Sequence, residues 1–147
     1  MREFTHTLTI DASPEAVLDA FFDHEALAIE HARRLNREVP LPVIRHLITR
    51  YAETTPSVID IIAAQPDSAA PLSPDSSTIG AEVIHTIRGE SALRLSDIVL
   101  RRTTFGAAGH PGAESLEACA AIAARELGWT PERVREEIAD VERVYQR

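Results

Sequence analysis

Apolar residues recur at three- and four-residue steps along most of this chain, which is the spacing of one face of an α-helix. The last stretch shows it most clearly, with an apolar stripe made of Val134, Ile138, Val141 and Tyr145. Thr130-Pro131 is an N-cap followed by a proline at the first helical position, and Gly128 is a C-terminal stop for the helix before it. Two terminal helices joined by a short turn are therefore predicted.

The same periodicity, together with proline and glycine stops, predicts the other elements. We expect helices over 14–37, 43–52, 56–64, 79–88, 97–102, 113–127 and 131–145. The helix over 14–37 could be interrupted near Asp23-His24. Gly89 could end the helix over 79–88, and Ser96 is expected to cap the helix over 97–102. Residues 65–78 hold three prolines and four serines and are expected to form a surface loop without regular structure.

Before the first helix, residues 4–10 alternate apolar side chains with threonines, which predicts a half-buried strand. The predicted fold class is therefore mainly α: a compact bundle of about six helices, to which one N-terminal β-strand could be added. The division suggested by the pattern is an N-terminal strand and helix segment at 1–39 and a helical domain at 40–147.

Charge and composition exclude several classes of protein. The net charge of −8 disfavours electrostatic binding to the phosphates of a nucleic acid. No apolar run is long enough for a transmembrane segment, and the N-terminus has no run typical of a signal peptide, so a cytoplasmic protein is expected. Cys119 is the single cysteine and lies in an alanine-rich run, which favours a small buried apolar residue over a reactive thiol.

No motif for catalysis or metal binding is found. The six histidines form no H-E-x-x-H frame, and His24 and His31, two helical turns apart, are the nearest approach to a pair. His85 is expected to be a partly buried space-filling residue. There is no G-x-G-x-x-G after a strand, no G-x-S-x-G and no Walker loop, so no catalytic residue, metal ligand or cofactor site is assigned to this chain.

One polar constellation stands out between residues 82 and 102. Guanidinium groups pair with carboxylates through two parallel hydrogen bonds. The first interpretation is therefore an arginine–carboxylate network that holds two short helices together. The alternative is an anion-binding site. The candidate residues are Glu82, Arg88, Glu90, Asp97, Arg101 and Arg102.

The run EVIHTIRGESALRLSDIVLRRT at 82–103 resembles the C-terminal helical domain of FAD-dependent glycerol-3-phosphate dehydrogenases. LPVIRHLITRYAETTPSVIDII at 41–62 and LGWTPERVREEIADVERVY at 127–145 resemble other helices of that domain, so the likeness covers about 40–147. This chain departs from the family pattern at Ala52, where a glycine commonly follows the tyrosine, and at Gly89 before the glutamate.

This resemblance implies a non-catalytic accessory domain. In the family, FAD lies in a separate, larger domain that oxidises glycerol 3-phosphate to dihydroxyacetone phosphate, and this chain holds no such domain. The implied partner is a flavin-binding domain or a like subunit, which includes a homo-oligomer. An alternative comes from TLTIDASPEAVLDAFFDHEAL at 7–27, because residues 1–28 resemble the first strand and helix of START-like proteins that bind small molecules or lipids.

Overall fold

The computed structural model describes residues 13–36, 38–103, 105–106 and 109–146, except for the side chains of 14–22. The described elements are almost all helical, and the only extended pairing among them is an isolated bridge between Pro71 and Ile79. Six helices have ten residues or more: α1 (Pro14–Arg34), α2 (Leu41–Tyr51), α3 (Thr55–Ala64), α4 (Gly80–Glu90), α6 (Ala113–Leu127) and α7 (Pro131–Tyr145). The mainly α class is thereby confirmed. The strand predicted at 4–10 lies outside the described residues.

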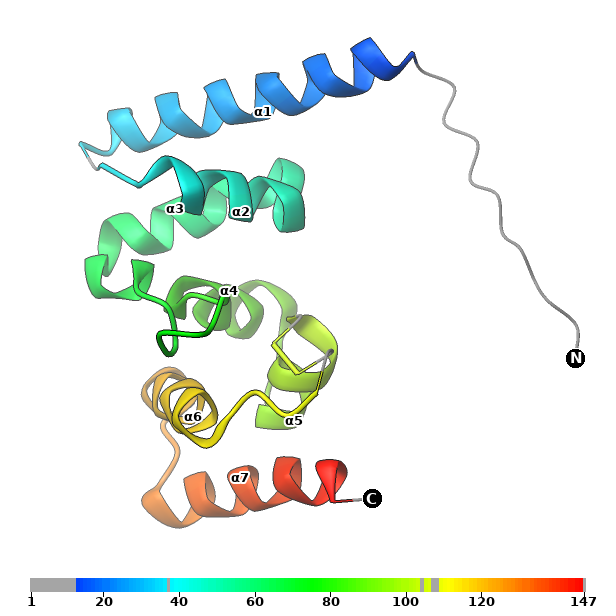
Figure 1. Cartoon of the computed structure of the whole chain (residues 1–147). Helices are drawn as coiled ribbons and strands as arrows, with labels where there is room; N and C mark the ends of the chain where they lie inside the picture. The colour runs from blue at the N-terminus through cyan, green and yellow to red at the C-terminus, as the bar shows by residue number, and fades with distance from the viewer. Residues whose placement is uncertain (1–12, 37, 104, 107–108, 147) are drawn as a thin grey trace, which may run out of the picture.

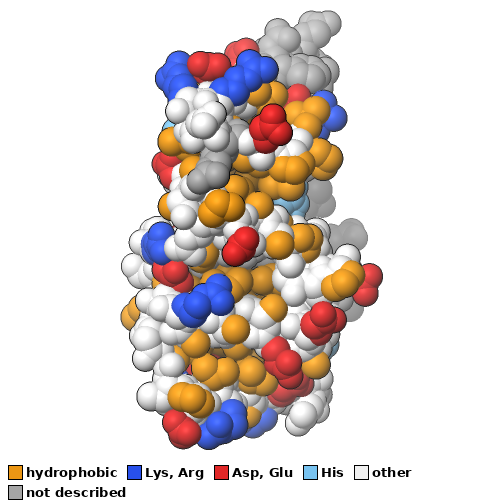
Figure 2. All heavy atoms as spheres, turned by 90° about the vertical axis from the view of Figure 1, so that its left-hand side faces the viewer, with side chains coloured by type: hydrophobic (Ala, Val, Ile, Leu, Met, Phe, Trp, Pro, Cys, Tyr) orange, Lys and Arg blue, Asp and Glu red, His pale blue; other side chains and the backbone are white. Residues whose placement is uncertain are grey.

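The helices are stacked in layers (Figure 1). Helix α1 lies at one end, α2 and α3 form the next layer, α4 lies in the middle, and α7 closes the other end below α6. None of the described helices is long and apolar enough to cross a bilayer. The face turned toward the viewer in Figure 2 carries acidic, basic and apolar side chains side by side.

Helix α4 is the centre of the stack and contributes to two hydrophobic cores. Ile84 and Ala81 pack with α1, α2 and α3, whereas Val83 and Ile87 pack with α6, α7 and the segment that contains α5 (Leu95–Asp97). A helix that is covered on every side needs apolar residues all round, and this explains why the run EVIHTI lacks a clear helical stripe. Burial decides for a helix where local propensity was ambiguous between helix and strand.

The terminal helices form as predicted. Gly128 adopts φ 67° at the C-cap of α6, a left-handed conformation that glycine enters without a steric penalty. The Thr130 side chain then accepts a hydrogen bond from the backbone N–H of Arg133 and caps α7. These two signals are local, so the sequence was sufficient to locate both helix ends.

Several predicted boundaries were wrong. Helix α1 runs through Asp23-His24 without a break and ends at Arg34 rather than near residue 37. Helix α4 passes Gly89 and ends at Glu90, because Ser91 takes the left-handed C-cap position with φ 56°. The 65–78 segment is not free of regular structure: Pro66 starts a 3-10 turn, η2 (Pro66–Ala69), which packs against α3 and α4 and buries Ser68.

The helix predicted at 97–102 is present in another form. It begins as α5 at Leu95 and continues as a π-helix, η3 (Ile98–Arg102). Ser96 lies inside α5 and does not cap it. The N–H of Leu95 donates instead to the carboxylate of Glu137 in α7, at 2.9 Å, so the cap comes from a distant helix.

The turn between α2 and α3 contains a strained residue. Ala52 adopts φ 41° and ψ −112°, a conformation that a residue with a Cβ rarely takes. It is followed by a short 3-10 turn, η1 (Ala52–Thr54), before α3 starts. The family that the sequence resembles commonly has a glycine at this position, and the backbone conformation gives a physical reason for one.

We predict that Ala52→Gly stabilises the protein by about 1 kcal/mol, because it removes backbone strain that exceeds the extra conformational entropy glycine has in the unfolded chain. Urea unfolding followed by circular dichroism measures the change. The matched control is Ala139→Gly in the middle of α7, which should cost about 1 kcal/mol. A destabilising Ala52→Gly would mean that the turn is not strained in solution.

Candidate functional site

The carboxylate of Glu82 is fully buried in the first turn of α4. Its Oε2 accepts a hydrogen bond from the N–H of Ile79 at 2.8 Å and lies 3.0 Å from His46 Nε2. Its Oε1 lies 3.1 Å from Arg50 Nε. His46 and Arg50 are one turn apart on α2, so a single face of that helix supplies both side-chain partners.

Two aromatic rings border this cluster. Tyr51 and His85 meet edge to face with their ring centroids 5.2 Å apart, and both are half-buried, as expected for His85. Burial, followed by the nearby Glu82 carboxylate, holds the pKa of Tyr51 above its ordinary value of 10.0. Tyr51 therefore stays a neutral phenol at physiological pH and is not activated as a general base.

The other five candidate residues are distributed over three sites. Arg88 of α4 makes a two-pronged contact with Glu126 of α6, with distances of 2.7 and 2.9 Å, and this contact raises the pKa of Arg88. Arg102 lies 3.5 Å from Glu90, and Arg101 lies 3.2 Å from Asp97 one turn earlier. The structure thus brings together two pairs of the six candidates. It pairs Glu82 and Arg88 with residues outside the set.

A second buried carboxylate was missed by sequence reasoning. Glu137 of α7 is 1% exposed, lies 3.1 Å from Arg94 Nε, and also pairs with Arg133 on its own helix. It is the group that caps α5 at Leu95. The available signal was its position three residues after Val134 and four before Val141, which places a charge within the apolar stripe of α7.

The remaining histidines are held in separate contacts. His31 lies 2.8 Å from Asp60 and joins α1 to α3, whereas His110 lies 3.0 Å from Glu142 and edge-on to Tyr145. Within the described part of the chain, no three His, Cys, Asp or Glu side chains gather in a way that could hold a metal ion. These contacts link helices and offer no shared coordination point.

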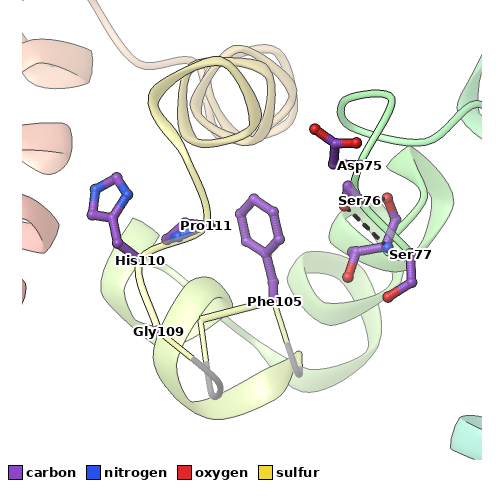
Figure 3. Close-up of a pocket in the computed structure, with 8 residues that line it drawn as sticks. Asp75, Ser76, Ser77, Phe105, Gly109, His110 and Pro111 are labelled. Carbon is purple, nitrogen blue, oxygen red and sulfur yellow. Dashed lines mark hydrogen bonds between the residues drawn. The ribbon is translucent and has the colours of Figure 1, made fainter.

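A hollow of about 330 Å³ lies between the 75–78 turn and the segment around Phe105 (Figure 3). Asp75, Ser76 and Ser77 line one side, and the Phe105 ring stands between them and Pro111. His110 lies on the far side of Pro111, where it contacts α7. His110 also lines the hollow, but the described residues show its imidazole paired with Glu142 and not with a serine hydroxyl.

Cys119 is fully buried in the lower core, as predicted for a small apolar residue. Burial raises the pKa of its thiol from 9.0 to about 12. A thiol with such a pKa is protonated at neutral pH and cannot act as a nucleophile.

Comparison with known proteins identifies the family. The model of the family described as the C-terminal domain of alpha-glycerophosphate oxidase matches residues 15–134. The chain belongs to this family. The matched region starts inside α1, so it extends further toward the N-terminus than the resemblance recognised in the sequence; the domain boundary at residue 39 stays a prediction.

Curated relatives agree with this assignment. Glycerol-3-phosphate dehydrogenase from Mycobacterium leprae is 31% identical over 112 residues, which are 76% of this chain and 19% of that protein. Glycerol-3-phosphate dehydrogenase 2 from Mycobacterium tuberculosis and its counterpart from Mycobacterium bovis are each 29% identical over 98 residues, 66% of this chain and 17% of the relative. The chain thus spans less than a fifth of the length of these relatives. No solved structure matches it.

We predict that Glu82→Gln destabilises the protein by about 3 kcal/mol, because it leaves His46 and Arg50 facing a neutral, buried amide. Chemical denaturation at pH 7 measures this. The control Glu132→Gln removes an exposed carboxylate that pairs with Arg135 and should leave the denaturation midpoint almost unchanged. Equal effects of the two substitutions would show that Glu82 is not buried in solution.

A pH dependence follows from Cys119. Its folded pKa is raised, so its contribution to stability is fully present below pH 9.0 and is lost as pH rises toward about 12. The loss has a slope of up to about 1.4 kcal/mol per pH unit. We expect Cys119→Ala to flatten the decline of stability between pH 9 and 11, measured by denaturant midpoints. Parallel curves for both proteins would mean that the thiol is accessible to water.

Proposed function

We propose that this chain is a non-catalytic helical accessory domain that packs against a flavin-binding catalytic domain of the glycerol-3-phosphate dehydrogenase type. The observation that carries the proposal is the family match over residues 15–134 combined with the short span, 19%, of the Mycobacterium leprae relative. More than four fifths of that relative lies outside the region shared with this chain, and that remainder has room for the flavin domain. Oxidation of glycerol 3-phosphate would be carried out there.

The described residues do not fit FAD. Dinucleotide sites of the Rossmann type need a parallel sheet and a glycine-rich turn that leads from a strand into a helix. The described part of the chain contains no strand beyond the isolated Pro71–Ile79 bridge. The same observation offers no sheet for the START-like alternative, whose ligand cavity is enclosed by a curved antiparallel sheet.

The polar clusters support an architectural role. The buried carboxylate of Glu82 is held by Arg50 and His46, and that of Glu137 by Arg94 and Arg133. Each carboxylate also accepts one backbone N–H at a helix start. Arg88 is fully engaged with Glu126. A substrate anion would have to compete with these internal carboxylates for the guanidinium groups, and the buried ones would be left without partners.

A first test is spectroscopic. The purified 147-residue chain should show no flavin absorbance near 450 nm at about one flavin per chain, and no dye-linked oxidation of glycerol 3-phosphate. Protein that retains stoichiometric flavin through size-exclusion chromatography would contradict the accessory role.

A second test concerns docking. The Mycobacterium leprae relative is produced without the segment that matches this chain. This chain is then added to the truncated enzyme as a separate protein, and we expect the two to co-elute in size-exclusion chromatography. The excised segment of the relative itself is the matched positive control. Binding of that segment but not of this chain would contradict docking to a domain of this type.

A further inference from the structure

Helix α6 has one face without a partner. Its buried residues, Leu116, Cys119, Ala120 and Ala123, face α4, α5 and α7. The opposite face is exposed at Glu114, Glu117, Ala121 and Arg125. In the lower half of Figure 2, hydrophobic side chains lie between acidic ones on the right and arginine on the left.

A groove of about 530 Å³ runs beside this face. Helix α6 lines it with Ala118, Ala121 and Ile122, and the opposite wall comes from the 65–72 segment and from Gly80 and Ile84 of α4. Small side chains on the α6 side leave room for a second helix to approach closely. The groove has both apolar and polar walls, because Gln65, Asp67 and Ser68 line it together with Leu72, Ile84 and Ile122.

The charges beside the groove are unsatisfied within the chain. Of the arginines that the structure describes, all except Arg33 and Arg125 form an ion pair with a carboxylate. Glu114 and Glu117 also have no ion-pair partner among the described residues. Arg125 is thus an exposed guanidinium on the same helix face as two exposed carboxylates, Glu114 and Glu117.

We propose that α6 packs antiparallel against α6 of a second copy of the chain, about a two-fold axis at Ala121. Glu117 and Arg125 are each four residues from Ala121, one before it and one after it. A two-fold axis at this residue therefore brings Arg125 of one copy level with Glu117 of the other, at both ends of the contact. Glu114 lies one turn further out and adds to the negative field that Arg125 meets.

The charge pattern selects a second copy over an unrelated protein. The acidic first half of the α6 face and its basic last half are complementary to themselves only when the helices run in opposite directions. In a parallel pair, like charges would meet at every level. The Ala121 pair at the axis lets the two backbones approach, because its side chains are small and exposed.

This inference goes beyond the proposed docking to a flavin domain and stands independently of it. Self-association is measured on this chain alone, whereas the docking test uses a truncated relative. A failure of one therefore leaves the other unaffected.

Sedimentation equilibrium of the full chain, with Glu117→Arg and Arg125→Glu, tests the contact. The wild type should form dimers, and each single variant should weaken dimerisation by about tenfold or more because like charges then face each other. An equimolar mixture of the two variants should dimerise again. The arginine introduced by Glu117→Arg then meets the glutamate introduced by Arg125→Glu, and the unchanged Arg125 of the first variant meets the unchanged Glu117 of the second. This rescue is specific to the antiparallel pairing.

Arg33→Glu is the matched control: it makes the same charge change at the other unpaired arginine, far from α6, and should leave the dimer unchanged. All three substituted residues are exposed, and circular dichroism verifies that each variant is folded. The inference is overturned if the wild type is monomeric at about 0.1 mM, if the single variants dimerise like the wild type, or if their mixture does not associate.

Discussion

The carboxylate of Glu82 is buried in α4, the helix that contributes to both hydrophobic cores. An ionised carboxylate without partners in such a place would cost several kcal/mol, so the structure around it must supply positive charge and hydrogen-bond donors. Helix α2 supplies the charge through Arg50 and a further polar contact through His46, and the start of α4 supplies a backbone N–H at Ile79. One buried carboxylate of α4 is thereby tied to α2.

The second hydrophobic core contains a similar arrangement around Glu137 of α7. Its carboxylate pairs with Arg94 and Arg133 and accepts a hydrogen bond from the backbone N–H of Leu95. Both carboxylates therefore join elements that are far apart in the sequence and also cap the start of a helix. Polar groups used in this way position helices, which supports the architectural role proposed for this chain.

Local signals predicted the helices well, and distant partners account for most of the errors. The ends of α6 and α7 depend on Gly128 and Thr130, which act within a few residues and were recognised. Ser96 was chosen as a cap because it is a good local candidate, whereas the actual cap is Glu137, about forty residues later. No rule based on neighbouring residues could find that contact.

The candidate site shows the same limit. Six charged residues within about twenty positions were expected to form one network, but residues close in sequence on a buried helix point in different directions. Glu82 turns toward α2 and Arg88 toward α6. The recognition of the family depended on the same stretch and was confirmed, because a sequence pattern is retained even where the partners of its side chains cannot be deduced.

A double-mutant cycle between Glu82 and Arg50 tests the central claim most directly. The free energies of unfolding are measured for the wild type, Glu82→Gln, Arg50→Gln and the double variant. If the buried carboxylate holds α2 against α4, the two substitutions should show a coupling energy of about 1 to 3 kcal/mol. Effects that add within about 0.5 kcal/mol would mean that the two side chains do not depend on each other, and would contradict this account.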